Sequence, residues 1–139
     1  MMGGRGSSTG VSDHGIPYGR EYHSLLTVGN IKFVVKLSGS TTAPMETMTK
    51  GRVYVTISPK GELKFISYYD NKNRRSKQID FEVAHNGILP HTHHGYNHNE
   101  FDGKKGCCKL TTKEKAMLNR VIRIWNDKKD DVWTRWLRR

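Results

Sequence analysis

Residues 52–70, RVYVTISPKGELKFISYYD, decide the fold. In the first half Val53, Val55 and Ile57 alternate with Arg52, Tyr54 and Thr56, and the alternation resumes from residue 63. A period of two residues is typical of a β-strand with one buried face. The Pro-Lys-Gly between the two halves indicates a tight turn, because Gly61 can adopt a positive φ. The stretch therefore predicts a β-hairpin.

Two more strands are expected on either side of this hairpin. IKFVVKL (31–37) alternates in the same way, and SKQIDFEV (76–83) would turn Ile79, Phe81 and Val83 toward the core. STTAPMETMTKG (40–51) reads as a loop because proline and glycine interrupt a strand. REYHSLLTV (20–28) has its apolar residues at helical spacing and predicts one short helix or turn. The expected sheet is a four-stranded antiparallel meander.

The period changes after Thr111, which forms a capping box with Glu114. An apolar stripe at helical spacing follows, made of Met117, Leu118, Val121, Ile122 and Trp125. Val132, Trp133, Trp136 and Leu137 repeat that spacing, as a second short helix or a continuation. We expect an α+β fold in which this C-terminal amphipathic helix packs on one face of the meander. Residues 1–15 predict a flexible Gly/Ser-rich tail, and residues 16–139 a single domain.

Composition excludes several other classes of protein. No apolar run approaches the roughly 20 residues that span a bilayer, and the N-terminus lacks the apolar stretch of a secretory signal. The two cysteines, Cys107 and Cys108, are adjacent, so no disulfide framework is expected and a reducing compartment is the default. We therefore expect a cytoplasmic protein without a membrane partner.

The net charge of +11 is unevenly distributed. Residues 50–77 carry +6 and residues 104–139 carry +8, whereas residues 78–103 carry −4. Basic flanks of this kind favour a polyanion such as RNA, because lysine and arginine release counterions from phosphates; a merely solubilising surface is the alternative. The residues predicted to bind nucleic acid are Lys50, Arg74, Arg75, Lys113 and Arg120.

The acidic island contains PHTHHGYNHNE (90–100), and five of the seven histidines lie between residues 85 and 98. Histidine transfers protons near neutral pH, so the cluster favours RNA cleavage by acid–base catalysis, with arginine or lysine stabilising the charged phosphorane. We expect His91 and His93 to lie over an outward sheet face that displays Arg52, Tyr54 and Lys77. The predicted catalytic set is His91, His93, Arg52, Lys77, Asp80 and Tyr54.

Two alternatives to metal-free catalysis stay open. A Zn²⁺ or Mn²⁺ site would use His91, His93, His98 and Glu100, and its bound water could hydrolyse a phosphodiester. The short His-x-His has no companion motif, however, so no cofactor is favoured. The second alternative is a polar loop whose histidines bond only backbone and water.

Four segments also carry a resemblance, namely YGREYHSLLTVGNIKFV (18–34), APMETMTKGRVYVTI (43–57), ISYYDNKNRRSKQIDFE (66–82) and GILPHTHHGYNHNE (87–100). Together they resemble a C-terminal domain of minor head proteins of phages and prophages in Gram-positive bacteria. The order of these motifs is also similar to toxin nucleases of the barnase/EndoU/RelE-like group.

The resemblance to those nucleases implies an antiparallel sheet with helices on one side and metal-independent RNA cleavage. It places Pro90-His91-x-His93 at the catalytic strand end, supported by Arg52, Lys77 and Asp80. The HGYNHNE that follows departs from the group and keeps a metal in consideration. We thus expect an RNase-like toxin or effector domain, virion-delivered or acting in the cytoplasm of a host or target bacterium. Expected partners are RNA and an immunity protein or phage head proteins. A non-catalytic module that binds nucleic acid or protein is the remaining alternative.

Overall fold

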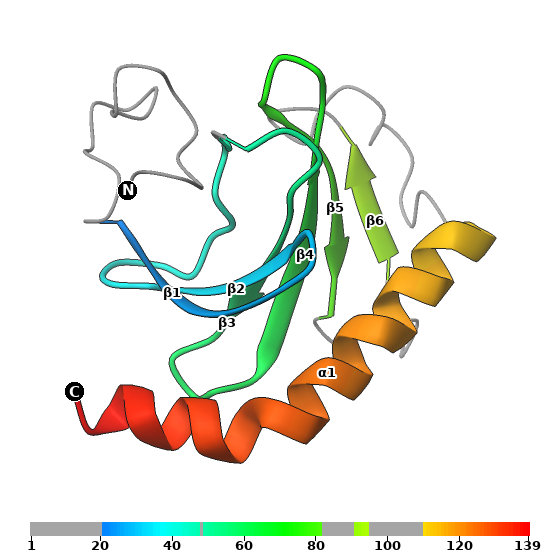
Figure 1. Cartoon of the computed structure of the whole chain (residues 1–139). Coiled ribbons are helices and arrows are strands. Elements are labelled where there is room, and N and C mark those ends of the chain that lie inside the picture. The colour runs from blue at the N-terminus through cyan, green and yellow to red at the C-terminus, as the bar shows by residue number, and fades with distance from the viewer. Residues whose placement is uncertain (1–20, 48, 82–90, 95–109) are drawn as a thin grey trace.

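One sheet and one helix form the part of the chain that the computed structural model describes, residues 21–47, 49–81, 91–94 and 110–139 (Figure 1). The strands lie in the sheet in chain order: β1 (Tyr22–Val28), β2 (Ile31–Lys36), β3 (Val53–Ile57), β4 (Leu63–Tyr69), β5 (Arg75–Asp80) and β6 (His91–His94). A single helix, α1 (Thr112–Leu137), crosses one face of the sheet. The α+β class is confirmed, but the sheet is mixed and has more strands than predicted.

The predicted helix or turn over residues 20–28 is wrong, because this segment is strand β1, antiparallel to β2. The register shifts between Ser24 and Leu26, so Leu25 is the extra residue of a β-bulge. A bulge breaks the period of two, and it leaves Tyr22, Leu25 and Leu26 at a spacing that mimics a helix. The apolar residues of β1 therefore give no strand pattern in the sequence.

The predicted hairpin is confirmed, and β3, β4 and β5 form an antiparallel meander. In contrast, β2 and β3 are parallel, which the prediction of an all-antiparallel sheet did not include. Parallel neighbours need a crossover, and here residues 37–52 provide one without a helix. The crossover runs over the face opposite α1, where the Tyr69 hydroxyl donates to the Pro44 carbonyl at 2.5 Å. At its start, the Tyr22 hydroxyl donates to the Thr42 carbonyl at 2.6 Å.

Helix α1 packs its apolar stripe onto the other face of the sheet. The capping box of Thr111 and Glu114 is confirmed at its start. The Trp125 ring stacks on Phe33 with centroids 5.5 Å apart, and its indole Nε1 donates to the Gly61 carbonyl at 3.0 Å. These two contacts join the helix to β2 and to the β3–β4 turn through one side chain, and Trp125 is only 2% exposed. Among the described residues, no helix combines the length and the apolar character needed to cross a membrane.

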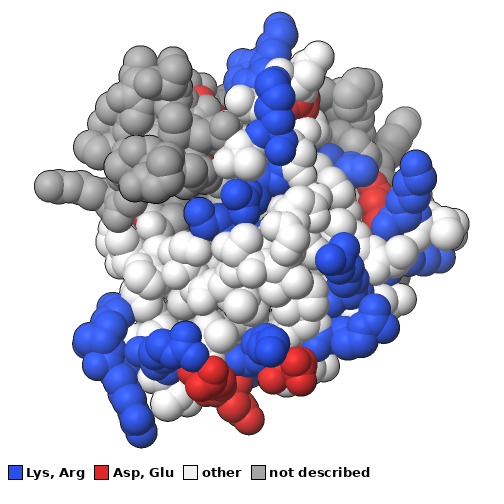
Figure 2. Space-filling model, viewed as in Figure 1, with Lys and Arg blue, Asp and Glu red and all other residues white. Residues whose placement is uncertain are grey.

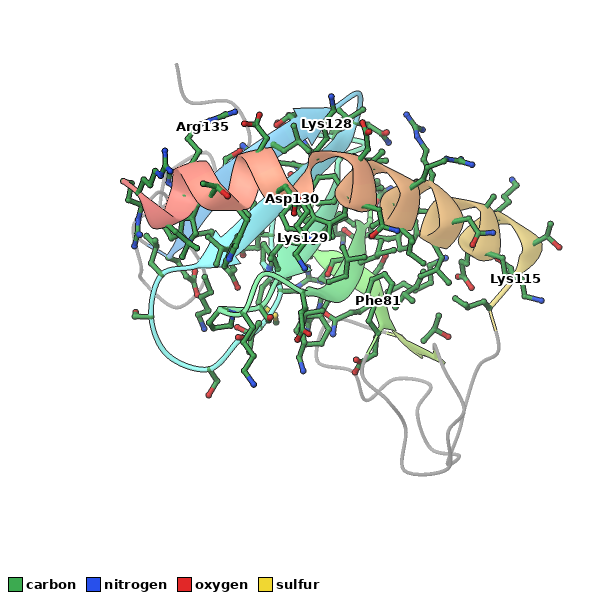
Figure 3. The ribbon with its side chains drawn as sticks, turned by 90° about the horizontal axis from the view of Figure 1, so that it is seen from below. Phe81, Lys115, Lys128, Lys129, Asp130 and Arg135 are labelled. Atoms are coloured by element: carbon green, nitrogen blue, oxygen red, sulfur yellow. The ribbon has the colours of Figure 1, made fainter. Side chains whose placement is uncertain are left out.

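The last turns of α1 continue the same helix rather than forming a second one. Trp133 packs beside Gly61, and Trp136 lies against His23 of β1 with ring centroids 4.6 Å apart. The Arg139 guanidinium covers the Trp136 ring at 3.5 Å. Figure 3, which looks onto the helix, shows charged side chains such as Lys115, Lys128 and Arg135 around its outer surface.

Replacing Gly61 by alanine tests the contact between the helix and the β3–β4 turn. Gly61 has φ +83°, and a Cβ would lie 2.9 Å from the Trp133 ring. We expect a loss of about 2–4 kcal/mol in the free energy of unfolding by urea, from left-handed strain plus overpacking. Gly39→Ala is the matched control: φ is +77° there and a Cβ meets nothing within 4 Å, so only about 1 kcal/mol should be lost. Equal losses in the two variants would contradict the packing.

Candidate active site

The face of the sheet opposite α1 carries two rows of residues that cross the strands, one mostly polar and one that alternates apolar and polar residues. Residues paired in register lie on the same face of a sheet, so each row can be followed from strand to strand. The first row is Lys32, Tyr54, Ser67, Gln78 and position 93. The second row is Val34, Thr56, Phe65, Asp80 and position 91. The two predicted catalytic histidines are thus register neighbours of polar residues on β5.

Asp80 is the β5 residue paired with His91. The residue is 8% exposed, and it lies at the end of β5, where the chain leaves the sheet. A buried carboxylate next to a histidine can accept one ring N–H, orient the imidazole and stabilise its protonated form. The register therefore gives Asp80 a position suited to an orienting group for His91.

Gln78, paired with His93, belongs to a buried hydrogen-bond network. Its Oε1 accepts from Ser67 Oγ at 3.4 Å and from Arg75 Nη1 at 3.2 Å. Because a guanidinium can only donate, the atom facing Arg75 must be the amide oxygen. This assignment leaves the amide nitrogen, with its two N–H donors, on the other branch of the Gln78 side chain. The sequence analysis did not predict Gln78 or Ser67 as site residues. The only signal for Gln78 was that it lies two residues before Asp80, and therefore on the same face of β5.

Tyr54 lies in the middle of the first row and is 4% exposed. Its ring meets Tyr69 edge-on at 5.4 Å, and Thr47 of the crossover donates to its hydroxyl at 3.3 Å. Burial raises the pKa of Tyr54, against smaller effects of the Thr47 hydrogen bond and the Arg52 charge. The hydroxyl therefore stays protonated near neutral pH. Such a group can serve as a neutral hydrogen-bond donor and not as a base.

Lys77 does not share the face of Arg52 and Tyr54, so its predicted placement is wrong. Residues 77 and 79 have the same parity on β5, and Lys77 therefore lies with the buried Ile79 on the helix side. There its ammonium pairs with the Glu114 carboxylate at 2.5 Å and lies 4.4 Å from the Tyr68 ring centroid. Lys77 thus connects the start of α1 to β5 on the helix side of the sheet. The rows that contain the histidine positions are on the other side.

The residues predicted to bind nucleic acid do not form one surface. Lys50 donates to the Asn71 carbonyl at 2.9 Å, beside the exposed Arg74 at the β4–β5 turn. Lys113 and Arg120 are exposed on α1, over the opposite face of the sheet. Figure 2 shows Lys and Arg side chains gathered at both places.

Arg75 is not a surface cation, which corrects its predicted role. It is 5% exposed, because its backbone pairs with the crossover, donating to Met45 at 2.7 Å, while its side chain bonds Gln78. The basic run around Arg74 and Arg75 gives no sequence indication that the crossover covers the second arginine.

The described residues bring together no group of three or more metal-ligating side chains. His98 and Glu100, two of the four residues in the alternative metal set, lie outside the described part of the chain. The metal alternative therefore stays a prediction.

Comparison of the chain with protein-family models, with curated proteins and with solved structures finds no match. The resemblance to phage head proteins and toxin nucleases likewise stays a prediction.

The Lys77–Glu114 pair predicts a pH-dependent contribution to stability. Burial opposes ionisation of Glu114, but hydrogen bonds from Lys77 and Thr111 outweigh it and hold the pKa of this carboxyl below its usual 4.5. Its stabilisation is therefore complete above about pH 4.5 and is lost as the pH falls through the lower folded-state pKa. We expect Lys77→Met to lower the free energy of unfolding by about 2 kcal/mol at pH 7.

The deficit of Lys77→Met relative to the native protein should shrink as urea unfolding is repeated at decreasing pH down to about 3, since protonated Glu114 no longer needs its partner. Lys128→Met is the control, because the Lys128–Asp127 contact is exposed and measures 3.7 Å. A deficit that stays constant from pH 7 to 3 would show that the ion pair is not its cause.

Proposed function

We propose that this domain is an RNase-like effector that cleaves RNA by histidine acid–base catalysis without a metal. The observation that supports this most directly is the register of β5 and β6, which pairs His91 with Asp80 and His93 with Gln78. The Gln78–His93 pair belongs to the row that also contains Tyr54 and Lys32, and the Asp80–His91 pair belongs to the row that contains Thr56, on the same face of the sheet. Each of the two histidine positions thus adjoins a polar residue of β5.

In the proposed reaction one imidazole removes the proton of the ribose 2′-hydroxyl, and the 2′-oxygen attacks the adjacent phosphorus. The bond from phosphorus to the 5′-oxygen breaks, and the second imidazole protonates that oxygen. The products are a 2′,3′-cyclic phosphate and a 5′-hydroxyl end. Arg52 and Tyr54, which the sequence predicted as supporting groups, lie three strand spacings of about 4.8 Å from β6, or roughly 14 Å, and are therefore too far away to contact the phosphate that reacts. Asp80 orients His91, and Lys77 acts indirectly by holding β5 against the helix.

Lys50 of the crossover, which bonds the Asn71 carbonyl, and Arg74 at the β4–β5 turn would hold the RNA backbone beside this face. They act through charge and give affinity without sequence preference. As a toxin or virion-delivered effector, the domain would act in the cytoplasm of a host or target bacterium, and an acidic immunity protein or a phage head protein would be its protein partner.

Cleavage of total RNA by the purified protein, with and without EDTA, tests the proposal. We expect cleavage in both conditions, and a loss of about 10²- to 10⁴-fold in rate for the double variant His91→Ala, His93→Ala. His23→Ala is the matched control, because His23 lies on β1 at the opposite edge of the sheet. A DNA strand of the same sequence should not be cut, since it has no 2′-hydroxyl.

Other outcomes would separate the alternatives. Loss of activity in EDTA, together with loss of bound metal on changing His98 or Glu100 to alanine, would replace the proposal by a metal-dependent phosphodiesterase. Absence of cleavage under every condition would favour the remaining alternative, a non-catalytic module that binds nucleic acid or protein.

A further inference from the structure

Strand β1 lies at one edge of the sheet, at the far side from the histidine strand β6. Among the described residues it pairs with β2 alone, so the N–H and C=O groups along its outer edge have no strand partner there. Edge strands of soluble proteins are commonly protected by charged side chains or proline, which discourage pairing with another chain. The sequence of β1, YHSLLTV, contains neither. A bulge at Leu25 interrupts the middle of the strand but leaves Tyr22–Ser24 regular.

Exposed apolar side chains adjoin the start of this open edge. Among the described residues, the large apolar side chains that are exposed are Leu37, at 41%, and Leu137, at 63%. The amide of Leu37 donates to the Glu21 carbonyl at 2.9 Å, directly before β1. Leu137 follows Trp136, whose ring centroid lies 4.6 Å from that of His23 on β1. The ends of β2 and α1 thus bring both leucines to the same end of β1, and apolar residues that gather on a surface are typical of an interaction site.

The charge beside these leucines indicates the kind of partner. Arg138 and Arg139 follow Leu137 and are exposed, and Figure 2 shows basic side chains at this end of α1. Neither arginine has a carboxylate partner among the described residues, whose ion pairs all involve other cations. A second copy of the chain is a poor occupant, because each copy carries a net charge of +11. Charge complementarity therefore favours a partner that supplies carboxylates.

We propose that the open edge of β1 binds an extended acidic segment of a partner protein by β-strand addition. The segment pairs with the backbone of Tyr22–Ser24, as in other complexes of this kind, where main-chain hydrogen bonds give affinity and side chains give specificity. An apolar side chain of the segment contacts Leu37 and Leu137, and its carboxylates meet Arg138 and Arg139.

The proposed partner leaves the histidine strand uncovered. Five strand spacings of about 4.8 Å separate β1 from β6, or roughly 24 Å. A segment bound at β1 therefore anchors the domain to another protein without blocking the opposite edge of the sheet. This inference goes beyond the proposed RNA cleavage and does not depend on it.

Binding of a fluorescein-labelled short peptide in which valine alternates with glutamate tests the site, with anisotropy giving the dissociation constant. We expect saturable binding by the native protein, and a several-fold weaker affinity for Leu137→Ser and for Arg138→Gln. Both side chains are exposed, so neither change should lower the Tm. Lys113→Gln is the matched control, because it removes an exposed cation from the other end of α1.

The same peptide N-methylated along its length separates strand addition from attraction by charge alone. It keeps every carboxylate but has no N–H donors, so we expect it to bind the native protein several-fold more weakly. Equal affinity of the two peptides, equal effects of Arg138→Gln and Lys113→Gln, or no binding at all overturns the proposal. A dimer of the native protein in sedimentation equilibrium that Leu137→Ser dissociates would place a second copy at this edge, and would overturn it as well.

Discussion

The packing of Trp125 against one face of the sheet is the interaction on which the remaining structure depends. The indole stacks on Phe33 and bonds the Gly61 carbonyl, so it fixes which face of each strand becomes the core. Once that face is chosen, the period of two sends the alternate residues of β2 to β5 to the other side. Tyr54 and Gln78 share a surface for this reason, although 23 residues separate them in the chain.

Helix α1 also supports β5, the strand that pairs with the histidine strand β6, through the ion pair of Lys77. The capping box holds Glu114 at the first turn of α1, and Glu114 in turn holds Lys77 of β5. Neighbouring Gln78 points to the opposite face, in register with His93. One strand is therefore braced from the helix side while it presents polar groups on the other side. Such support from the helix side would hold the proposed site on a rigid element, as precise proton transfer requires.

Local patterns in the sequence predicted much of this fold, and pairings between distant segments account for what was missed. The hairpin around Gly61 and the capping box depend on residues within a few positions of each other. The parallel pairing of β2 with β3 depends on where a crossover of about sixteen residues lies, and no local pattern encodes that. The same crossover buries Arg75. Lys77 was misplaced because its charge suggested an outward face, whereas its parity with Ile79 indicated the helix side.

The central claim is that the face opposite α1, and not the basic surface of the helix, binds RNA. Backbone amide shifts in NMR spectra, recorded as a non-cleavable 2′-O-methyl RNA strand is added, test it most directly. We predict that the largest shifts occur at the histidine strand and the strand it pairs with, at residues 77–80 and 91–94, and that α1 changes little around Lys113 and Arg120. Shifts confined to α1, with the rows unaffected, would contradict it.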